Sequence, residues 1–96
     1  MILAVDIGNT TIHLGMMKGT RVVKRFILEN HPNPQILSKQ LSVILRKMKS
    51  SKISRAAICS VVPGKTKNVE AAVKKVLGLK SVVIGRDLIV PLTNRY

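Results

Sequence analysis

The 96-residue sequence has little of three things: one cysteine, two aromatic residues and four carboxylates. The single cysteine, Cys59, excludes an internal disulfide and is typical of a reducing compartment. It lies in the apolar run AAIC, so we expect a small buried side chain rather than a nucleophile. With only Phe26 and Tyr96 aromatic, the core must be aliphatic. No apolar run reaches membrane-spanning length and no signal peptide precedes the first strand, so we expect a cytoplasmic protein without a membrane partner.

Positive charges greatly outnumber negative ones. Seventeen Lys and Arg residues against four acidic ones give a net charge of +13, which favours a polyanionic partner: nucleic acid, a phosphorylated metabolite or an acidic protein surface. The lack of aromatic rings for base stacking argues against nucleic acid. A basic cluster at Arg46, Lys47, Lys49 and Lys52 is better explained by a solvated helix end, stabilised by the helix dipole, than by a specific binding patch.

Hydrophobic periodicity predicts the elements. Ile12, Leu14 and Met16 alternate as in a strand with one buried face, while leucines recur at helical spacing after Asn33, a good N-cap with Pro34 next to it. Gly78 is typical of a helix C-cap. The predicted elements are strands over residues 2–6, 11–17, 20–28, 54–62 and 81–85 and one helix over residues 34–49. A second helix is marked by Val69, Ala72, Val73, Val76 and Leu77 and ends at Gly78.

The order β-β-β-α-β-α-β predicts an α/β fold. We expect a mixed sheet within a single domain spanning residues 1–96, antiparallel at the first hairpin, parallel afterwards, and thinly covered by helices on both faces. Such thin cover is as consistent with a fragment, or a subunit that needs a partner, as with a self-sufficient domain.

The stretch DIGNT, residues 6–10, carries the most chemistry. Asp6 ends an apolar strand, where a buried carboxylate would be costly unless paired or bound to a metal. Gly8 permits a tight turn and close approach of a ligand, and Asn9 and Thr10 add polar groups beside backbone amides. Together these residues could hold a phosphate while Asp6 holds Mg²⁺. A simple β-turn is the alternative interpretation, but the preceding strand and following hairpin favour a phosphate loop.

Three segments resemble one family in order and spacing. The opening MILAVDIGNTTIHLGMMKG is similar to the start of type III pantothenate kinases, members of the actin/hexokinase/Hsp70-like ATPase superfamily with a ribonuclease-H-like domain. CSVVPGKT (59–66) resembles the family's Ser-Ser-Val-Val-Pro segment, and VPLTNRY (90–96) resembles its Pro-x-x-x-x-Tyr stretch. The resemblance covers essentially the whole chain.

The resemblance implies a role for eight residues. Asp6 would organise the magnesium ion and phosphates of ATP, Gly8, Asn9 and Thr10 would line the phosphate loop, Ser60, Val61 and Pro63 would form the active-site wall, and Tyr96 would border the pantothenate site. The implied reaction transfers the γ-phosphoryl group of ATP to pantothenate, the entry step to coenzyme A, supported by potassium or ammonium.

The family's Gly-Ala-Asp-Arg motif, which supplies the general base, and its second phosphate loop lie beyond Tyr96. We therefore expect the chain to act as the N-terminal half of such a kinase. Its partner would be a second copy, as in a dimer, or a complementary C-terminal half. Because phosphoryl transfer depends on complete positioning and charge stabilisation, we expect no substantial activity from these residues alone.

Two alternatives remain open. A ribonuclease-H-like nuclease would also place Asp6 on the first strand, but two-metal hydrolysis needs converging carboxylates, and Glu29, Glu70 and Asp87 are scattered along the sequence. A non-catalytic partner or regulatory relative is the other alternative.

Overall fold

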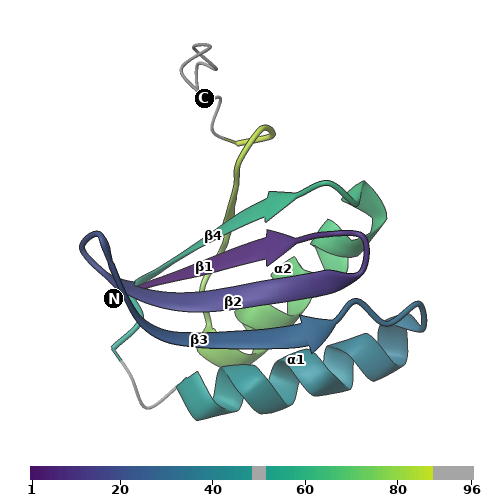
Figure 1. Ribbon diagram of the computed structural model, residues 1–96, viewed down its shortest axis with the longest axis horizontal. Helices are drawn as coiled ribbons and strands as arrows, with labels where there is room; N and C mark the ends of the chain where they lie inside the picture. Colours follow the sequence, from purple (N-terminus) through teal and green to yellow (C-terminus); the bar gives the residue numbers. More distant parts are fainter. Residues whose placement is uncertain (49–51, 88–96) are drawn as a thin grey trace.

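The computed structural model describes residues 1–48 and 52–87, and there the elements follow the predicted order (Figure 1). They are β1 (Ile2–Ile7), β2 (Thr11–Lys18), β3 (Arg21–Glu29), α1 (Pro34–Met48), β4 (Arg55–Ser60), α2 (Pro63–Leu77) and β5 (Val82–Val83).

The strands form one mixed sheet in the order β3-β2-β1-β4-β5. β1 pairs antiparallel with β2, and β2 with β3, whereas β4 runs parallel to both β1 and β5. The sequence prediction of an antiparallel hairpin followed by parallel strands is confirmed. The carboxyl ends of β1 and β4 therefore lie side by side at one edge of the sheet, with Ile7 in register with Ser60.

Both helices pack on the same face of the sheet, so the prediction of helices on both faces is wrong (Figure 1). The connections from β3 to β4 and from β4 to β5 each join parallel strands and advance in the same direction across the sheet. Right-handed crossovers must then place both helices on one side. Within residues 1–48 and 52–87, no helix covers the opposite face of the sheet, which we call the open face.

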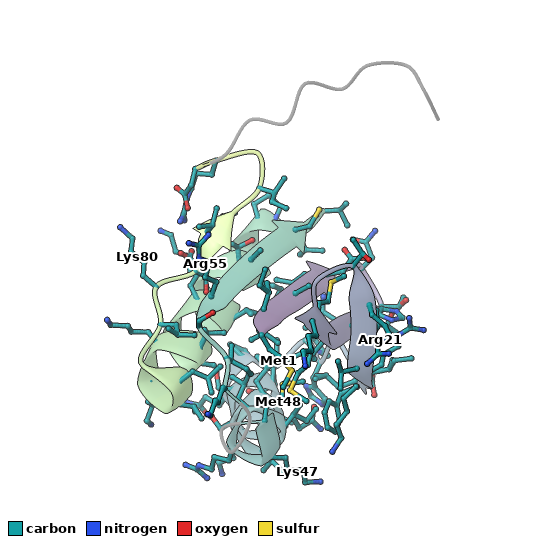
Figure 2. All side chains as sticks on the ribbon, turned by 90° about the vertical axis from the view of Figure 1, so that its left-hand side faces the viewer. Met1, Arg21, Lys47, Met48, Arg55 and Lys80 are labelled. Atoms are coloured by element: carbon teal, nitrogen blue, oxygen red, sulfur yellow. The ribbon has the colours of Figure 1, made fainter. Side chains whose placement is uncertain are left out.

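The open face decides which side chains are exposed. Along β1 the odd positions Leu3, Val5 and Ile7 are buried under the helices, while Ile2 is 40% exposed and Asp6 is exposed. An aliphatic core was predicted, and its fully buried large side chains are all aliphatic: Leu3, Ile7, Ile12, Leu14, Leu37, Leu41, Leu45, Met48, Ile58, Val69 and Val73. Figure 2 shows Met48 in this core, while Lys47 and Lys80 extend outward from the molecule.

The predicted helix ends are confirmed at two positions. The side-chain oxygen of Asn33 accepts hydrogen bonds from the backbone amides of Gln35 (2.9 Å) and Ile36 (3.3 Å), which satisfies free donors of the first turn. Gly78 ends α2 in the left-handed conformation (φ 70°), and its amide binds the carbonyl of Lys74 at 3.0 Å. In the part of the chain that the structure describes, no helix is long and apolar enough to span a bilayer.

Two strands are shorter than predicted. β4 stops at Ser60 because the Ser60 hydroxyl and the Val62 backbone bond each other at 3.0 Å and turn the chain into α2. β5 is limited to two residues because the chain turns at Gly85 (φ 94°), where the Asp87 carboxylate accepts the Val83 amide at 3.0 Å.

Candidate active site

The predicted phosphate loop joins β1 to β2 at the carboxyl edge of the sheet. Residues 8–10 leave the end of β1 and return into β2 at Thr11. The amide of Val61, directly after β4, donates to the carbonyl of Ile7 at 3.1 Å. The loop and the β4–α2 junction are therefore direct neighbours, although more than fifty residues separate them in the sequence.

Backbone hydrogen bonds hold this loop in a narrow conformation. The Gly8 amide donates to the Thr11 carbonyl at 2.9 Å. A Cβ atom at Gly8 would lie only 3.1 Å from that same carbonyl oxygen, so a side chain there would need the loop backbone to shift by a few tenths of an ångström. Gly8 has no positive φ; it allows close approach within the loop rather than the tight, glycine-specific turn that the sequence suggested.

Asn30, for which no role was predicted, holds the loop in place through two hydrogen bonds. Its side-chain amide donates to the Gly8 carbonyl at 2.7 Å, and its backbone amide donates to the Thr10 carbonyl at 2.9 Å. Both contacts join segments about twenty residues apart. Only the position of Asn30 directly after the apolar β3, in a segment that breaks the strand pattern, could have drawn attention to it.

A residue of α2 makes a second set of hydrogen bonds that holds this region in place. The ammonium group of Lys65, in the first turn of α2, donates to the carbonyls of His31 (2.9 Å) and Pro32 (3.2 Å). Lys65 thus fixes the segment that carries Asn30 against the β4–α2 junction. No sequence pattern indicated this contact, because any of the seventeen basic residues could have made it.

Asp6 is exposed on the open face, not buried as its apolar surroundings in the sequence suggested. It stands in register with His13 on β2 and with Cys59 on β4. Cys59 is exposed as well, so the prediction of a buried thiol is wrong. Alternation along β4 explains this: Ile58 faces the helices and Cys59 faces the side that no helix covers.

Asp6 and its neighbours border a shallow hollow on the open face. This hollow has a volume of ≈ 250 Å³ and a mainly apolar lining that includes Ala4, Gly15 and Ala57. The Asp6 carboxylate reaches solvent at the rim, next to the loop of residues 8–10. An exposed carboxylate beside backbone amides is a donor set that suits a hydrated Mg²⁺ ion with bound phosphates.

The predicted wall residues lie at the same edge. Ser60 is half-buried, Val61 is 67% exposed and Pro63 is the first residue of α2. The Ser60 hydroxyl donates to the Val62 carbonyl and accepts from the Val62 amide, so its polar contacts lie within its own turn. No side chain caps the start of α2, and a helix N-terminus of this kind favours an anion. Tyr96 and the rest of residues 88–96 lie outside the described residues.

Two of the remaining carboxylates are engaged elsewhere. Arg86 binds both oxygens of Glu70, at 2.8 and 2.9 Å, and both oxygens of Asp87, at 2.9 and 2.8 Å. The hydrogen bond from Arg86, helped by the Val83 amide, lowers the pKa of Asp87 to about 2. Across residues 1–48 and 52–87, no three His, Cys, Asp or Glu side chains gather as a metal site. These residues alone therefore do not form the carboxylate cluster that a two-metal nuclease needs.

Known proteins match this chain along its length. The family model of type III pantothenate kinase matches residues 2–96. The type III pantothenate kinase of Persephonella marina is 32% identical over 100 residues, which cover 100% of this chain and 39% of the relative. That of Finegoldia magna is 28% identical over 100 residues, which cover 100% of this chain and 38% of the relative. The chain thus spans about two fifths of the length of these relatives.

Solved structures show the same fold. The RuvC structure of Thermus thermophilus matches with a TM-score of 0.60 at 14% identity, covering 85% of this chain and 60% of that one. A member of the Ppx/GppA family from Aquifex aeolicus matches with a TM-score of 0.52 at 12% identity, covering 85% of this chain and 34% of that one. The predicted ribonuclease-H-like, actin-like ATPase fold is confirmed.

Proposed function

Because this chain belongs to the type III pantothenate kinase family, we propose that it provides the phosphate-holding part of an enzyme that phosphorylates pantothenate with ATP. The observation that carries the proposal is the position of Asp6, exposed beside the braced loop of residues 8–10 at the carboxyl edge of the sheet. Ligands of open α/β sheets bind at this edge.

In this proposal each part of the loop has a separate task. The carboxylate of Asp6 holds the magnesium ion, directly or through a water molecule. The backbone amides of Asn9 and Thr10, with the Asn9 amide and Thr10 hydroxyl groups, bind phosphate oxygens. Bound Mg²⁺ would supply charge neutralisation for the phosphates. Asn30 and Lys65 keep the loop in place, so little ordering entropy is lost when the nucleotide binds.

The groups that bind pantothenate and act as the general base lie outside the described residues in this proposal. Tyr96 borders the pantothenate pocket, and the general base comes from a segment equivalent to the remaining three fifths of the relatives. The partner is either a complementary chain that supplies this segment or a second copy in a homo-oligomer, such as a dimer. Potassium or ammonium supports the reaction, which we place in cytoplasmic coenzyme A synthesis. The 96 residues alone have no substantial kinase activity.

A chimera tests this proposal. The matched segment of the Persephonella marina enzyme, which aligns with all of this chain at 32% identity, is replaced by residues 1–96. We expect ATP-dependent phosphorylation of pantothenate, faster with potassium or ammonium than with sodium. Asp6→Asn should lower kcat/KM by roughly 100-fold or more, as the loss of a charge-stabilising group does in other enzymes.

The matched control is Glu29→Gln, which removes a carboxylate from the same end of the sheet, at the last residue of β3. It should change kcat/KM less than about threefold, because Glu29 lies on β3, two strands away from Asp6, and its exposed charge is screened by solvent. A chimera that melts as cooperatively as the parent enzyme but does not phosphorylate pantothenate would contradict the proposal. Equal losses from Asp6→Asn and Glu29→Gln would contradict the role of Asp6.

A further inference from the structure

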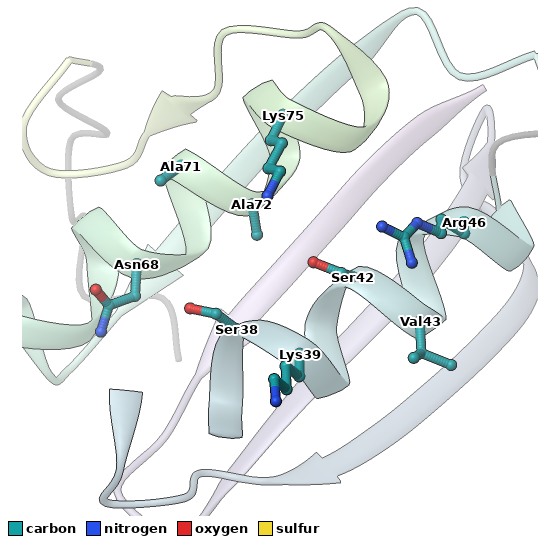
Figure 3. A pocket seen from close by; sticks show the side chains of 9 residues that line it. All are labelled: Ser38, Lys39, Ser42, Val43, Arg46, Asn68, Ala71, Ala72 and Lys75. Carbon is teal, nitrogen blue, oxygen red and sulfur yellow. The ribbon is translucent and has the colours of Figure 1, made fainter. Parts of the chain in front are cut away.

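A groove of ≈ 520 Å³ runs between α1 and α2 on the solvent side of the helical layer (Figure 3). On α1 its lining flanks the stripe of core residues Leu37, Leu41 and Leu45, and on α2 it reaches the buried Ala72. Small side chains, Ala71 and Ala72, line it on the α2 side. Its polar lining consists of Ser38, Lys39, Ser42, Arg46, Asn68 and Lys75.

The groove carries three positive charges and no carboxylate. For Lys39, Arg46 and Lys75, the structure of residues 1–48 and 52–87 gives neither an ion pair nor a hydrogen bond. The α1 sequence PQILSKQLSVILRKM contains no acidic residue. The one carboxylate of α2, Glu70, is bound to Arg86. The three cations are therefore not neutralised within the helical layer.

The helix dipole does not account for this arrangement. It favours cations in the last turn, which fits Arg46 and Lys75. Lys39, however, lies in the second turn of α1, where that effect is absent. An acidic residue one turn away would form a stabilising pair with an exposed lysine on a helix, and α1 provides none. The distribution indicates a surface that binds an anion.

Polar donors point into the space between the helices, as the charged ends of Arg46 and Lys75 do (Figure 3). Figure 3 shows the hydroxyl groups of Ser38 and Ser42 and the guanidinium group of Arg46 directed from α1 toward α2. Asn68 extends from α2 toward Ser38 at the opposite end from Arg46. Ammonium, guanidinium, hydroxyl and amide groups are all donors, and together they match the several acceptor oxygens of a phosphate chain.

The spacing of these groups indicates the ligand class. Ser38 and Arg46 are eight residues apart on one helix, or about 12 Å along its axis, so one phosphate or sulfate cannot contact both ends. The volume falls within the range of roughly 300–1,000 Å³ that is usual for small-molecule sites. We propose that the α1–α2 groove binds a small molecule with a chain of phosphates or several phosphate groups, independently of the phosphate loop at Gly8–Thr10.

Titration of the 96-residue chain with inorganic tripolyphosphate tests this proposal. EDTA is included so that no divalent ion links the probe to Asp6. We expect saturable binding, with the backbone amide NMR signals of residues 38–46 and 68–75 shifting most. Lys39→Gln/Arg46→Gln/Lys75→Gln should weaken binding by roughly tenfold or more, because hydrogen bonds to charged groups are among the stronger ones. All three side chains are exposed, so the variant should melt like the parent.

The matched control is Lys18→Gln/Arg21→Gln/Lys52→Gln, which removes the same charge from exposed positions outside the groove. It should weaken binding less than about threefold, as expected for screened charges. Asp6→Asn should leave tripolyphosphate binding intact, which separates this site from the proposed kinase site. Equal losses from the two triple variants, or no saturable binding, would overturn the proposal. Tighter binding of an oligo-glutamate peptide or a single-stranded oligonucleotide would also overturn it, in favour of an acidic protein or nucleic acid.

Discussion

The side-chain amide of Asn30 donates to the backbone carbonyl of Gly8 at 2.7 Å, across twenty-two positions of the sequence. This contact joins the exit of β3 to the loop between β1 and β2. It is partly buried, so its loss would leave a poorly solvated carbonyl without a partner. The backbone amide of Asn30 reinforces it by binding the Thr10 carbonyl.

We therefore expect Asn30→Asp to destabilise the fold by about 1–3 kcal/mol, the usual effect of leaving a buried polar group unpaired. The variant keeps the shape of the side chain but removes the donor. Urea unfolding measures the change, and faster hydrogen exchange of the loop amides should accompany it. Asn9→Asp, at an exposed position of the same loop, should change the free energy of unfolding by less than about 0.5 kcal/mol. Equal effects would contradict the bracing role of Asn30.

The one-sided helical layer makes adjacent residues of β1 differ sharply. Leu3 is 0% exposed beneath the helices, and Ile2 is 40% exposed on the open face. Leu3→Ala should lower the free energy of unfolding by about 2–5 kcal/mol, the range for core leucines. Ile2→Ala should lower it by less than about 1 kcal/mol. Similar losses in urea unfolding would mean that the second face is covered.

The exposure of Cys59 predicts a reactive thiol in the native state. An aromatic disulfide reagent should label one thiol per chain without denaturant, at a rate close to that of the unfolded chain. Cys59→Ser should change the free energy of unfolding by less than about 0.5 kcal/mol, as is usual for surface substitutions. Labelling that requires urea would instead place Cys59 in an apolar environment.

The Arg86 cluster predicts acid sensitivity. The pKa of Asp87 is lowered to about 2 from its ordinary value of 3.8, first by the hydrogen bond from Arg86 and then by the Val83 amide. A carboxylate with a lowered pKa stabilises the fold above its unfolded-state pKa and loses this contribution as the pH falls through the folded-state value. The contribution should thus be complete above about pH 4 and disappear near pH 2.

Urea unfolding of the parent and of Asp87→Asn across that interval measures this effect. The difference in free energy of unfolding between the two proteins should shrink between pH 4 and pH 2. It should also shrink in high salt, because the cluster is exposed and salt screens it. If the difference does not change with pH, the charge of Asp87 does not contribute to stability. Asp87 would then act only as the acceptor of the hydrogen bond from the Val83 amide.

Local patterns predicted much of this fold. The alternation in β2, the Asn33 cap of α1 and the Gly78 cap of α2 each depend on residues within a turn or two of one another. The family resemblance pointed to Asp6 and residues 8–10, and in the structure Ile7, which lies between them, contacts Ser60 and Val61.

What the sequence could not predict depends on tertiary contacts. Continuous apolar stretches around Asp6 and Cys59 suggested burial on both sides, but the handedness of two crossovers left one face open. The contacts of Asn30 with Gly8 and of Lys65 with His31 join segments twenty-two and thirty-four positions apart. No local pattern specifies such pairs, and among many lysines no single one is distinguished.

The most direct test of the central claim is a titration of the 96-residue chain with ATP and excess Mg²⁺, followed by backbone amide NMR. We expect saturable shifts of Gly8, Asn9, Thr10 and Val61, and Asp6→Asn should weaken this binding by roughly tenfold or more, as expected for loss of a metal-holding carboxylate. Tripolyphosphate with EDTA should leave these amides unshifted. Saturable binding of Mg²⁺–ATP that shifts other residues only, or that is equally strong in Asp6→Asn, would contradict the assignment of this loop.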